Sequence, residues 1–152
     1  MQIRVPRWNG TVRRALPADQ AAIEKLLAAA RLPVEGVGTF LADFFVAEDA
    51  GQIVGAVGLE RYGTCGMLRS LVVRAGRRGQ GLGSALSQQL LEHSDGSGLI
   101  ETYLLASTAV TFFPRFGFVD IEREQVPPDV QRSRDFLDTS PASAVVMRRS
   151  LR

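Results

Sequence analysis

Apolar residues recur at helical spacing in two long segments of the chain. The first segment begins after Pro17, and proline is favoured in the first turn of a helix. The second follows a glycine-rich stretch at residues 76–83. The two apolar stripes consist of Ile23, Leu26, Leu27 and Ala30, and of Leu82, Ala85, Leu86 and Leu90. This spacing predicts two amphipathic helices, of which the second packs against a sheet.

Shorter apolar runs between turn residues predict the strands. In chain order we expect strands at residues 11–16, 44–48, 53–59, 67–73, 99–105, 118–126 and 142–149. Short turns join the second, third and fourth of these, which predicts an antiparallel meander. We also expect a weaker helix at 36–43, a short aromatic helix at 109–116, and a loop at 127–141. This order of elements favours an α+β domain with a mixed sheet.

Composition indicates one ordinary globular domain. The 152 residues are 45% apolar and 22% charged, which is enough to bury a core and excludes a disordered or fibrous chain. We assign residues 11–152 to this domain and residues 1–10 to an N-terminal extension. The N-terminus lacks the apolar stretch of a secretory signal, and no uncharged run is long enough to cross a bilayer.

Charge and cysteine usage narrow the range of partners. The formal net charge is only +2, so a nucleic-acid binder is not expected and any anion site must be local. Cys65 is the only cysteine, which excludes an internal disulfide and fits a reducing cytoplasm. His93 is the only histidine, and we expect it near a helix C-terminus or on the surface. With so few ligands of these types, we expect no metal site, and we expect no membrane partner.

The most informative stretch is residues 71–84, where an apolar strand is followed by a glycine-rich turn and then a helix. Alternate glycines at 79–83 let the backbone approach a ligand closely, and the N–H groups of a helix N-terminus attract phosphate. Arg74, Arg77 and Arg78 add positive charge. The turn lacks the Gly-Lys-Ser or Gly-Lys-Thr of a Walker A loop and the spacing Gly-x-Gly-x-x-Gly. The pattern therefore predicts an anion site of another kind.

The segment Arg78-Gly79-Gln80-Gly81-Leu82-Gly83 resembles the pyrophosphate-binding signature of the GNAT superfamily of N-acetyltransferases. That signature reads Gln or Arg, any two residues, Gly, any residue, and Gly or Ala. The apolar strand before it resembles the superfamily's fourth strand, and residues 112–118 resemble its late aromatic-Gly-Phe motif. The resemblance covers nearly the whole chain from residue 11. It implies an α+β GNAT fold with a central mixed, mostly antiparallel sheet of six to seven strands flanked by about four helices.

This resemblance implies acetyl-CoA as the cosubstrate. In the family, the sheet is splayed at its fourth and fifth strands, and the gap admits the pantetheine arm. Carried over to this chain, backbone groups of Leu71, Val72 and Val73 pair with that arm. The residues that hold the pyrophosphate are then Arg78, Gly79, Gln80, Gly81, Leu82, Gly83 and Ser84.

Residues nearer the C-terminus point to a group within the superfamily. Residues 105–109 and 136–147 resemble the enzymes encoded in bacterial arsenic-resistance operons, often called ArsN. The acetyltransferase domain of N-acetylglutamate synthase is a more distant likeness. Both imply a small amino-acid-like acceptor and, in the first case, a link to arsenic resistance. Families of this kind also commonly form homodimers.

Acetyl transfer needs a donor for the oxygen that gains negative charge and a base for the amine proton. The backbone N–H of Val73 is our candidate for polarising the thioester carbonyl. Glu60, at the end of the third predicted strand, is our first choice for a base acting through water. Glu48, at the end of the second, could also lie beside the acceptor. For each glutamate the alternative is a solvated carboxylate at a strand end.

Arg69 lies in the middle of a predicted strand, where an unpaired arginine would be costly unless it met an anion. One interpretation is that Arg69 binds the carboxylate of the acceptor. The other is a structural ion pair with Glu48 or Glu60.

Phe113 stands where many members of the superfamily have a tyrosine that returns a proton to the CoA thiolate. A thiol pKa of about 8.5 still lets CoA leave as the thiolate, and Ser107 or Thr108 could substitute. The leading interpretation is an N-acetyltransferase in which the amine attacks directly in a ternary complex. The alternatives are a protein acetyltransferase that modifies lysine or chain N-termini and a non-catalytic CoA-binding sensor.

Overall fold

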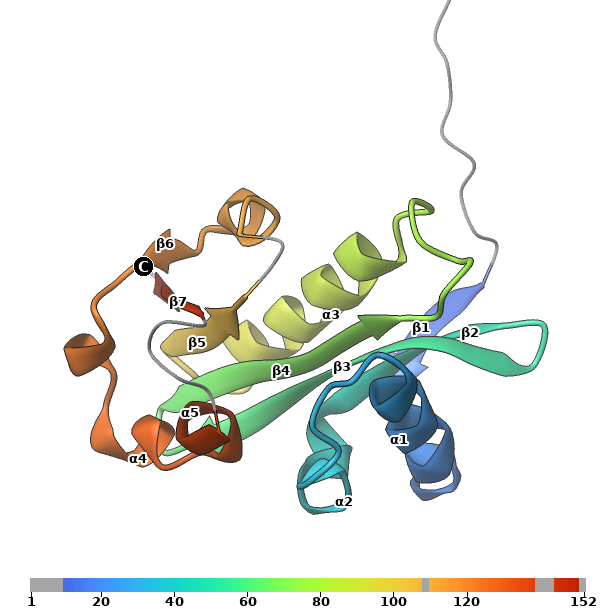
Figure 1. Cartoon of the computed structure of the whole chain (residues 1–152), viewed down its shortest axis with the longest axis horizontal. Helices are drawn as coiled ribbons and strands as arrows, with labels where there is room; N and C mark the ends of the chain where they lie inside the picture. The colour runs from blue at the N-terminus through green and yellow to red at the C-terminus, as the bar shows by residue number, and fades with distance from the viewer. Residues whose placement is uncertain (1–9, 108–109, 139–143, 151–152) are drawn as a thin grey trace, which may run out of the picture. The chain divides into compact units, whose positions relative to one another are not determined.

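The computed structural model describes residues 10–107, 110–138 and 144–150, and Figure 1 shows its elements. The strands are β1 (Thr11–Arg14), β2 (Phe44–Asp49), β3 (Gln52–Tyr62), β4 (Cys65–Val73), β5 (Glu101–Ala106), β6 (Val119–Asp120) and β7 (Val145–Ser150). The α-helices are α1 (Gln20–Ala29), α2 (Val37–Phe40), α3 (Leu82–Gly96), α4 (Pro128–Gln131) and α5 (Arg134–Asp138). Short 3-10 helices cover Pro17–Asp19, Leu41–Asp43, Phe113–Phe116 and Arg123–Gln125. Within this part of the chain, no helix is long and apolar enough to cross a membrane.

The strands form one seven-stranded mixed sheet in the order β1-β2-β3-β4-β5-β7-β6. The pairs β1–β2, β2–β3, β5–β7 and β6–β7 are antiparallel, whereas β4 and β5 are parallel. A parallel pair requires a crossover connection, and α3 supplies it. The predicted α+β class and the mostly antiparallel sheet are therefore confirmed. The described residues contain five α-helices where about four were expected.

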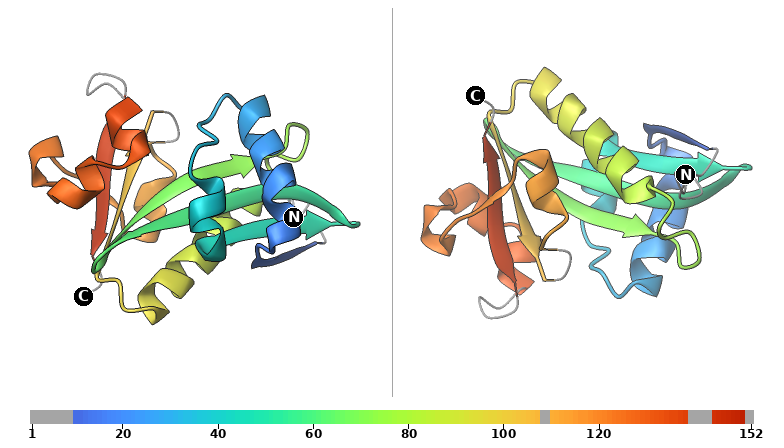
Figure 2. Two further views of the ribbon diagram at one scale, coloured as in Figure 1. Left: turned by 90° about the horizontal axis from the view of Figure 1, so that it is seen from below. Right: turned by 90° about the horizontal axis from the view of Figure 1, so that it is seen from above.

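The described residues form two compact units, and β3, β4 and α3 contribute residues to both. The first unit comprises residues 10–58 and 70–91. Its core joins Ile23 and Leu27 of the first predicted stripe to Phe44 of β2, all fully buried. Figure 2 shows α1 and α3 on opposite faces of the strands of this unit. Gly55 permits the close approach of α3, because a Cβ there would lie 3.0 Å from Cδ1 of Leu86.

The second unit comprises residues 59–69, 92–107, 110–138 and 144–150. Met67 of β4 and Tyr103 of β5 are paired in the ladder and pack with Val130 of α4 and Phe136 of α5. All four side chains are buried. The chain between β6 and β7 is thus fixed against its strands by apolar contacts.

Most predicted elements occur with shifted ends. The first long helix begins at Gln20, because residues 17–19 form a 3-10 turn in which Leu16 N–H donates to Asp19 Oδ2 at 2.7 Å. The predicted helix at 36–43 is α2 followed by a 3-10 turn. The predicted aromatic helix is a 3-10 helix at Phe113–Phe116. Parts of the predicted N-terminal extension, aromatic helix, loop at 127–141 and last strand lie outside the described residues, because the structure does not describe residues 1–9, 108–109, 139–143 and 151–152.

Two predictions near the C-terminus are wrong. The strand expected at 118–126 ends at Asp120, because the polar residues that follow form a 3-10 turn instead, in which Glu122 N–H donates to Gln125 Oε1 at 2.8 Å. The loop expected at 127–141 contains α4 and α5. Pro128 occupies the first turn of α4, a position where the missing N–H of proline removes no helical hydrogen bond.

Candidate active site

The predicted pyrophosphate-binding turn connects the end of β4 to the start of α3 (Figure 1). Gly79 and Gly81 have φ angles of +82° and +88°, in the left-handed region that glycine adopts without steric cost. A Cβ atom at either position would meet no heavy atom within 4 Å. The turn therefore presents bare backbone beside open space.

The first turn of α3 adds hydrogen-bond donors to this backbone. Ala85 N–H donates to the Gly81 carbonyl at 3.0 Å, which begins the helical ladder. The amides of Leu82, Gly83 and Ser84 then have no acceptor within the helix. These amides and the positive end of the helix dipole favour an anion. The residues present therefore fit the pyrophosphate of CoA.

The three arginines of the turn have different surroundings. Arg77 donates to Gln80 Oε1 at 3.2 Å and forms an ion pair with Asp49 of β2. It therefore anchors the turn to β2. Arg74 is exposed and donates to a glutamine of β3 at 2.9 Å. Arg78 is exposed and makes no ion pair with a carboxylate in the part of the chain that the structure describes.

Successive residues at the end of β4 point their backbone N–H and C=O groups in opposite directions. Arg74 N–H donates to the Val54 carbonyl at 2.8 Å, which extends the pairing with β3. Because backbone groups of successive strand residues point to opposite edges, the amides of Leu71 and Val73 point away from β3. The backbone of Val72 points toward β3, and its side chain is buried in the first core. Leu71 and Val73 thus have the orientation required to pair with a cofactor, and Val72 does not.

Ser70 gives β4 an unusual conformation. Its φ angle is +62°, and a left-handed non-glycine residue costs about 1–3 kcal/mol. The ladder with β5 covers only Cys65 to Met67, although β4 continues to Val73. Such a residue redirects a strand, and backbone strain of this kind concentrates at functional sites. A serine in a run of strand-forming residues gives no sequence signal for it.

Glu60 and Arg69 form a buried ion pair in the second unit. Arg69 Nη1 donates to Glu60 Oε2 at 2.7 Å, and the two side chains are 1% and 4% exposed, in that order. The hydroxyl of Tyr62 donates to the other carboxylate oxygen, Oε1, at 2.6 Å. The structural ion pair, left as an alternative for Arg69, is therefore formed with Glu60. Both oxygens of Glu60 are engaged, so it is not a solvated carboxylate.

Tyr62 is a member of this group that sequence reasoning missed. It is half-buried and packs against the core of the second unit. Burial first, and then the hydrogen bond to Glu60 and its negative charge, raise the pKa of Tyr62. The hydroxyl therefore keeps its proton at neutral pH. Residues two apart on a strand share a face. The Glu60-Arg61-Tyr62 sequence therefore indicates contact between Glu60 and Tyr62 once the strand predicted at 53–59 is extended to residue 62.

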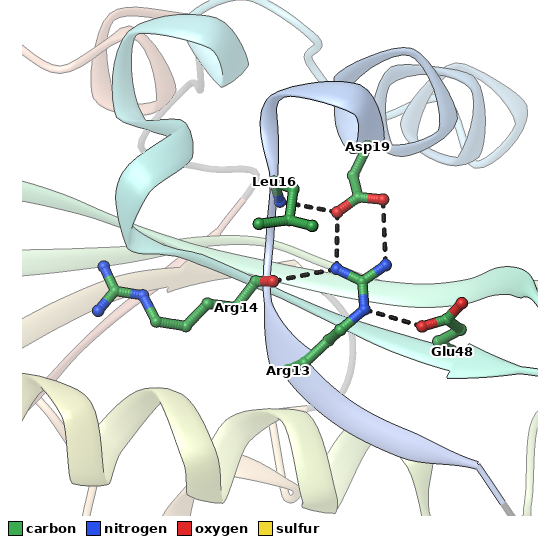
Figure 3. Close-up of polar contacts among 5 residues, drawn as sticks. All are labelled: Arg13, Arg14, Leu16, Asp19 and Glu48. Atoms are coloured by element: carbon green, nitrogen blue, oxygen red, sulfur yellow. Dashed lines mark hydrogen bonds and ion pairs between the residues drawn. The ribbon is translucent and has the colours of Figure 1, made fainter.

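Glu48 has a different partner, in the first unit. Arg13 Nε donates to Glu48 Oε1 at 2.8 Å, and the same guanidinium holds Asp19 through Nη1 and Nη2 at 2.8 and 3.2 Å (Figure 3). The hydrogen bond from Arg13 is the main reason that the pKa of Asp19 lies below its ordinary value. This group joins β1, β2 and the chain that leads into α1. Of the two partners considered for Arg69, the one found is Glu60.

Phe113, which stands where many members of the superfamily have a tyrosine, is a core residue. Phe113 is buried and packs edge-on against Phe112, with ring centroids 5.1 Å apart. Phe118 is buried beside it, with a centroid distance of 5.9 Å. Ser107 is exposed just after β5, and Thr108 lies outside the described residues.

The remaining titratable candidates do not form a metal centre. His93 lies in the last turn of α3, as expected, with Nε2 3.3 Å from Nη2 of Arg61. Cys65 is half-buried at the start of β4, and burial raises its pKa. Among residues 10–107, 110–138 and 144–150, no group of three or more His, Cys, Asp or Glu residues could hold a metal ion.

Comparison with protein families and curated proteins gives a consistent result. Residues 41–120 match the model of the acetyltransferase (GNAT) domain. An uncharacterized N-acetyltransferase of Chlorobaculum tepidum is 29% identical over 136 residues, which cover 84% of this chain and 87% of that protein. N-acetyltransferase 8 of Mus musculus is 32% identical over 121 residues, which cover 73% of this chain and 49% of that protein.

Solved structures with the same fold include complexes with CoA. Rv2747 from Mycobacterium tuberculosis, in complex with CoA and NLQ, superimposes with a TM-score of 0.79 and 27% identity, over 93% of this chain and 99% of that chain. N-acetylglutamate synthase from Neisseria gonorrhoeae, complexed with coenzyme A and N-acetyl-glutamate, gives a TM-score of 0.82 at 18% identity. That match covers 95% of this chain and 35% of the synthase chain, and it concerns the fold alone.

Proposed function

Because the chain belongs to the acetyltransferase (GNAT) domain family, we propose that it acetylates the amine of a small, amino-acid-like molecule. It is an acetyl-CoA-dependent N-acetyltransferase of this family. The observation that carries the proposal is the open glycine turn between β4 and α3, with its left-handed glycines and helix N-terminal amides. The acceptor class is supported by Rv2747, a relative that was solved with CoA and NLQ.

We assign the cofactor-binding roles to the turn and the end of β4. Residues 78–84 hold the pyrophosphate, and the backbone of Leu71 and Val73 pairs with the pantetheine arm. When bound, acetyl-CoA supplies a thioester whose carbonyl carbon takes the acceptor nitrogen while its sulfur leaves with the electron pair. The amide N–H of Val73 donates to the thioester oxygen, because it points away from β3. A fixed backbone donor stabilises developing negative charge without reorganising.

We assign the removal of the amine proton to Tyr62 and Glu60. Glu60 is almost completely buried, so water and amine have little access to it, whereas Tyr62 is half-buried and its hydroxyl donates to Glu60 at 2.6 Å. The acceptor proton passes to the Tyr62 oxygen while the Tyr62 proton passes to Glu60 Oε1. The products are a neutral amine, an intact phenol and a protonated Glu60. In this proposal Glu60 remains the base, and Tyr62 replaces the water first expected between base and amine.

Arg69 acts as a positioning residue in this proposal. Its side chain is 1% exposed and bonded to Glu60, so it fixes the carboxylate that faces Tyr62. Contact between Arg69 and an acceptor carboxylate would require this buried side chain to move. Binding of the acceptor by Glu48, the arsenic-resistance link, the cytoplasmic location and the homodimer remain predictions.

The experiment that tests the function follows thiol release from acetyl-CoA with a panel of acceptors. The panel pairs free amino acids, glutamate and glutamine included, with short peptides that present the same amines. We expect free amino acids to accelerate thiol release over the acceptor-free reaction and peptides not to do so. Acceleration by peptides alone would contradict the acceptor class, and no acceleration across the panel would contradict the catalytic function.

A further inference from the structure

The first turn of α5 lies on the core cluster that Tyr62 packs against, within the second unit. Ser133, the residue just before α5, is buried, and its hydroxyl donates to Sδ of Met67 at 3.2 Å. The same hydroxyl accepts from the N–H of Phe136 at 3.4 Å. Phe136 and Met67 belong to one buried cluster, and Tyr62 packs against that cluster. These contacts fix the start of α5 on the face of the sheet where Tyr62 lies.

Asp135 brings a second carboxylate to this place. It lies in the first turn of α5, between the two residues that anchor that turn, and it is half-buried. Its negative charge contributes to the raised pKa of Tyr62, after burial, the hydrogen bond to Glu60 and the charge of Glu60. Coulomb interactions weaken with distance. The Asp135 carboxylate therefore lies near the Tyr62 hydroxyl.

Negative charge outweighs positive charge at the Tyr62 hydroxyl. Glu60 and Asp135 both raise the pKa of Tyr62, and each raises it by more than the positive charge of Arg69 lowers it. Arg69 is bonded to Glu60 at 2.7 Å, so its charge is offset within that pair. A region of negative potential attracts cations and repels carboxylates. A molecule held at this hydroxyl is therefore sorted by its charge.

We propose that Asp135 is a specificity-determining residue that favours acceptors with a positively charged side chain, an inference that rests on the function proposed above. In that function the reacting amine lies at the Tyr62 hydroxyl, so the rest of the acceptor lies within reach of the charge of Asp135. A basic amino acid gains an attractive contact there, a neutral one gains none, and an acidic one is repelled. Asp135 takes no part in the proton transfer, which stays with Tyr62 and Glu60.

Acetylation rates of four free amino acids test the assignment. Arginine and citrulline have nearly the same shape and differ by one positive charge, whereas glutamate and glutamine differ by one negative charge. We expect kcat/KM of wild-type protein to be about tenfold higher for arginine than for citrulline, the size of one charged contact. It should be about tenfold lower for glutamate than for glutamine. The differences should lie mainly in KM, because Asp135 contacts the acceptor without reacting.

Asp135→Asn keeps the shape of the side chain and removes its charge. We expect both ratios of kcat/KM to fall within about twofold of one in this variant. Asp129→Asn is the matched control, because Asp129 lies in the first turn of α4, exposed and paired with Arg132. Both variants lose a carboxylate near a helix N-terminus. The control should keep both ratios of the wild-type protein.

The salt dependence of wild-type rates gives a second readout, which does not depend on the folding of a variant. Salt shortens the range of electrostatic interactions from about 30 Å at 0.01 M to about 3 Å at 1 M. Raising the KCl concentration across this range should reduce the preference for arginine over citrulline at least about threefold. The ratio for the two neutral acceptors, citrulline and glutamine, should stay constant.

The outcomes separate this inference from the proposed function. Equal kcat/KM for arginine and citrulline at low salt, or a preference for glutamate over glutamine, would overturn the inference and leave the function intact. An equal loss of activity toward all four acceptors in Asp135→Asn would show a structural role and also overturn it, as would a preference for arginine that salt does not change. Failure of wild-type protein to acetylate any free amino acid would contradict the proposed function, and this inference with it.

Discussion

The glycine turn and the Glu60–Tyr62–Arg69 group differ in the chemical groups that they present and in how exposed those groups are to solvent. The turn uses backbone amides beside open space, and a Cβ atom added at Gly79 or Gly81 would meet no heavy atom within 4 Å. The Glu60–Tyr62–Arg69 group uses charged side chains packed almost out of contact with solvent. A substitution in the turn can therefore abolish ligand binding with little loss of stability. A substitution in the buried group instead affects stability and activity together.

The largest effect is expected from Glu60→Gln. This substitution leaves the guanidinium of Arg69 buried without its counter-charge, which costs about 3–5 kcal/mol in the free energy of unfolding. Glu48→Gln is the control, because Glu48 is half-exposed in its pair with Arg13 and should cost less than about 1 kcal/mol. Urea unfolding of both variants at pH 7 measures the difference. Similar small losses in the two variants would contradict the buried character of the Glu60–Arg69 pair.

The next effect concerns the glycine turn. Gly81→Glu places bulk and negative charge beside the amides of α3, so we expect acetyl-CoA affinity to fall by at least about 100-fold. Gly98→Glu is its control, because Gly98 has the same φ of +88° and no heavy atom within 4 Å of an added Cβ. Both variants should lose about 1–2 kcal/mol of stability from left-handed strain. Calorimetric titration and thermal melts separate the two effects, and equal affinities in the two variants would argue against the turn as the pyrophosphate site.

A smaller effect is expected at the tyrosine of the buried group. Tyr62→Phe removes the hydroxyl between acceptor and Glu60 and should lower kcat about 10- to 100-fold, within the range of general acid–base contributions. Tyr103→Phe is matched to it, because Tyr103 also donates to the glutamate two residues before it, Glu101, at 2.8 Å. Steady-state rates with saturating acetyl-CoA should change less than about twofold in the Tyr103 variant. Equal effects on kcat would indicate that the Tyr62 hydroxyl is structural.

The smallest effect is expected at the partly exposed group around Arg13. The pKa of Asp19 is lowered in the folded state by Arg13, so its stabilising contribution is present above the unfolded pKa of about 3.9. That contribution is lost as pH falls through the lower folded pKa. Asp19→Asn should therefore reduce stability by about 1 kcal/mol at pH 7 and flatten its pH dependence below about pH 4. Urea unfolding across this range measures it, and parallel curves for variant and wild type would contradict the assignment.

The same contrast explains what sequence could predict. The glycine turn was found because bare backbone needs glycine at fixed positions, and Gly79 and Gly81 do adopt the left-handed conformation. The stripes of α1 and α3 were found because one face of each helix is buried, as Leu86 and Leu90 show. Patterns of this kind can be recognised from a few neighbouring residues of the sequence alone.

Other features depend on contacts between distant residues or on backbone detail. The choice of Glu60 over Glu48 as the partner of Arg69 follows from which strands carry them, and sequence left both open. Arg77 and Arg78 are adjacent and chemically identical, yet only Arg77 meets Asp49 of β2. The strand expected at 118–126 was wrong because a local polar turn at Glu122–Gln125 competed with the ladder. Ser70 adopts a left-handed conformation that its residue type does not predict.

The most direct test of the central claim compares wild-type protein with Gly81→Glu in one reaction, with acetyl-CoA and the free amino acids as substrates. Mass spectrometry counts the acetylated amino acid, and a thiol reagent counts the CoA released. We predict equal amounts of the two products with wild-type protein, and neither above the uncatalysed level with Gly81→Glu. Thiol release without any acetylated amine, or undiminished acetylation by the Gly81 variant, would contradict acetyl transfer at this site.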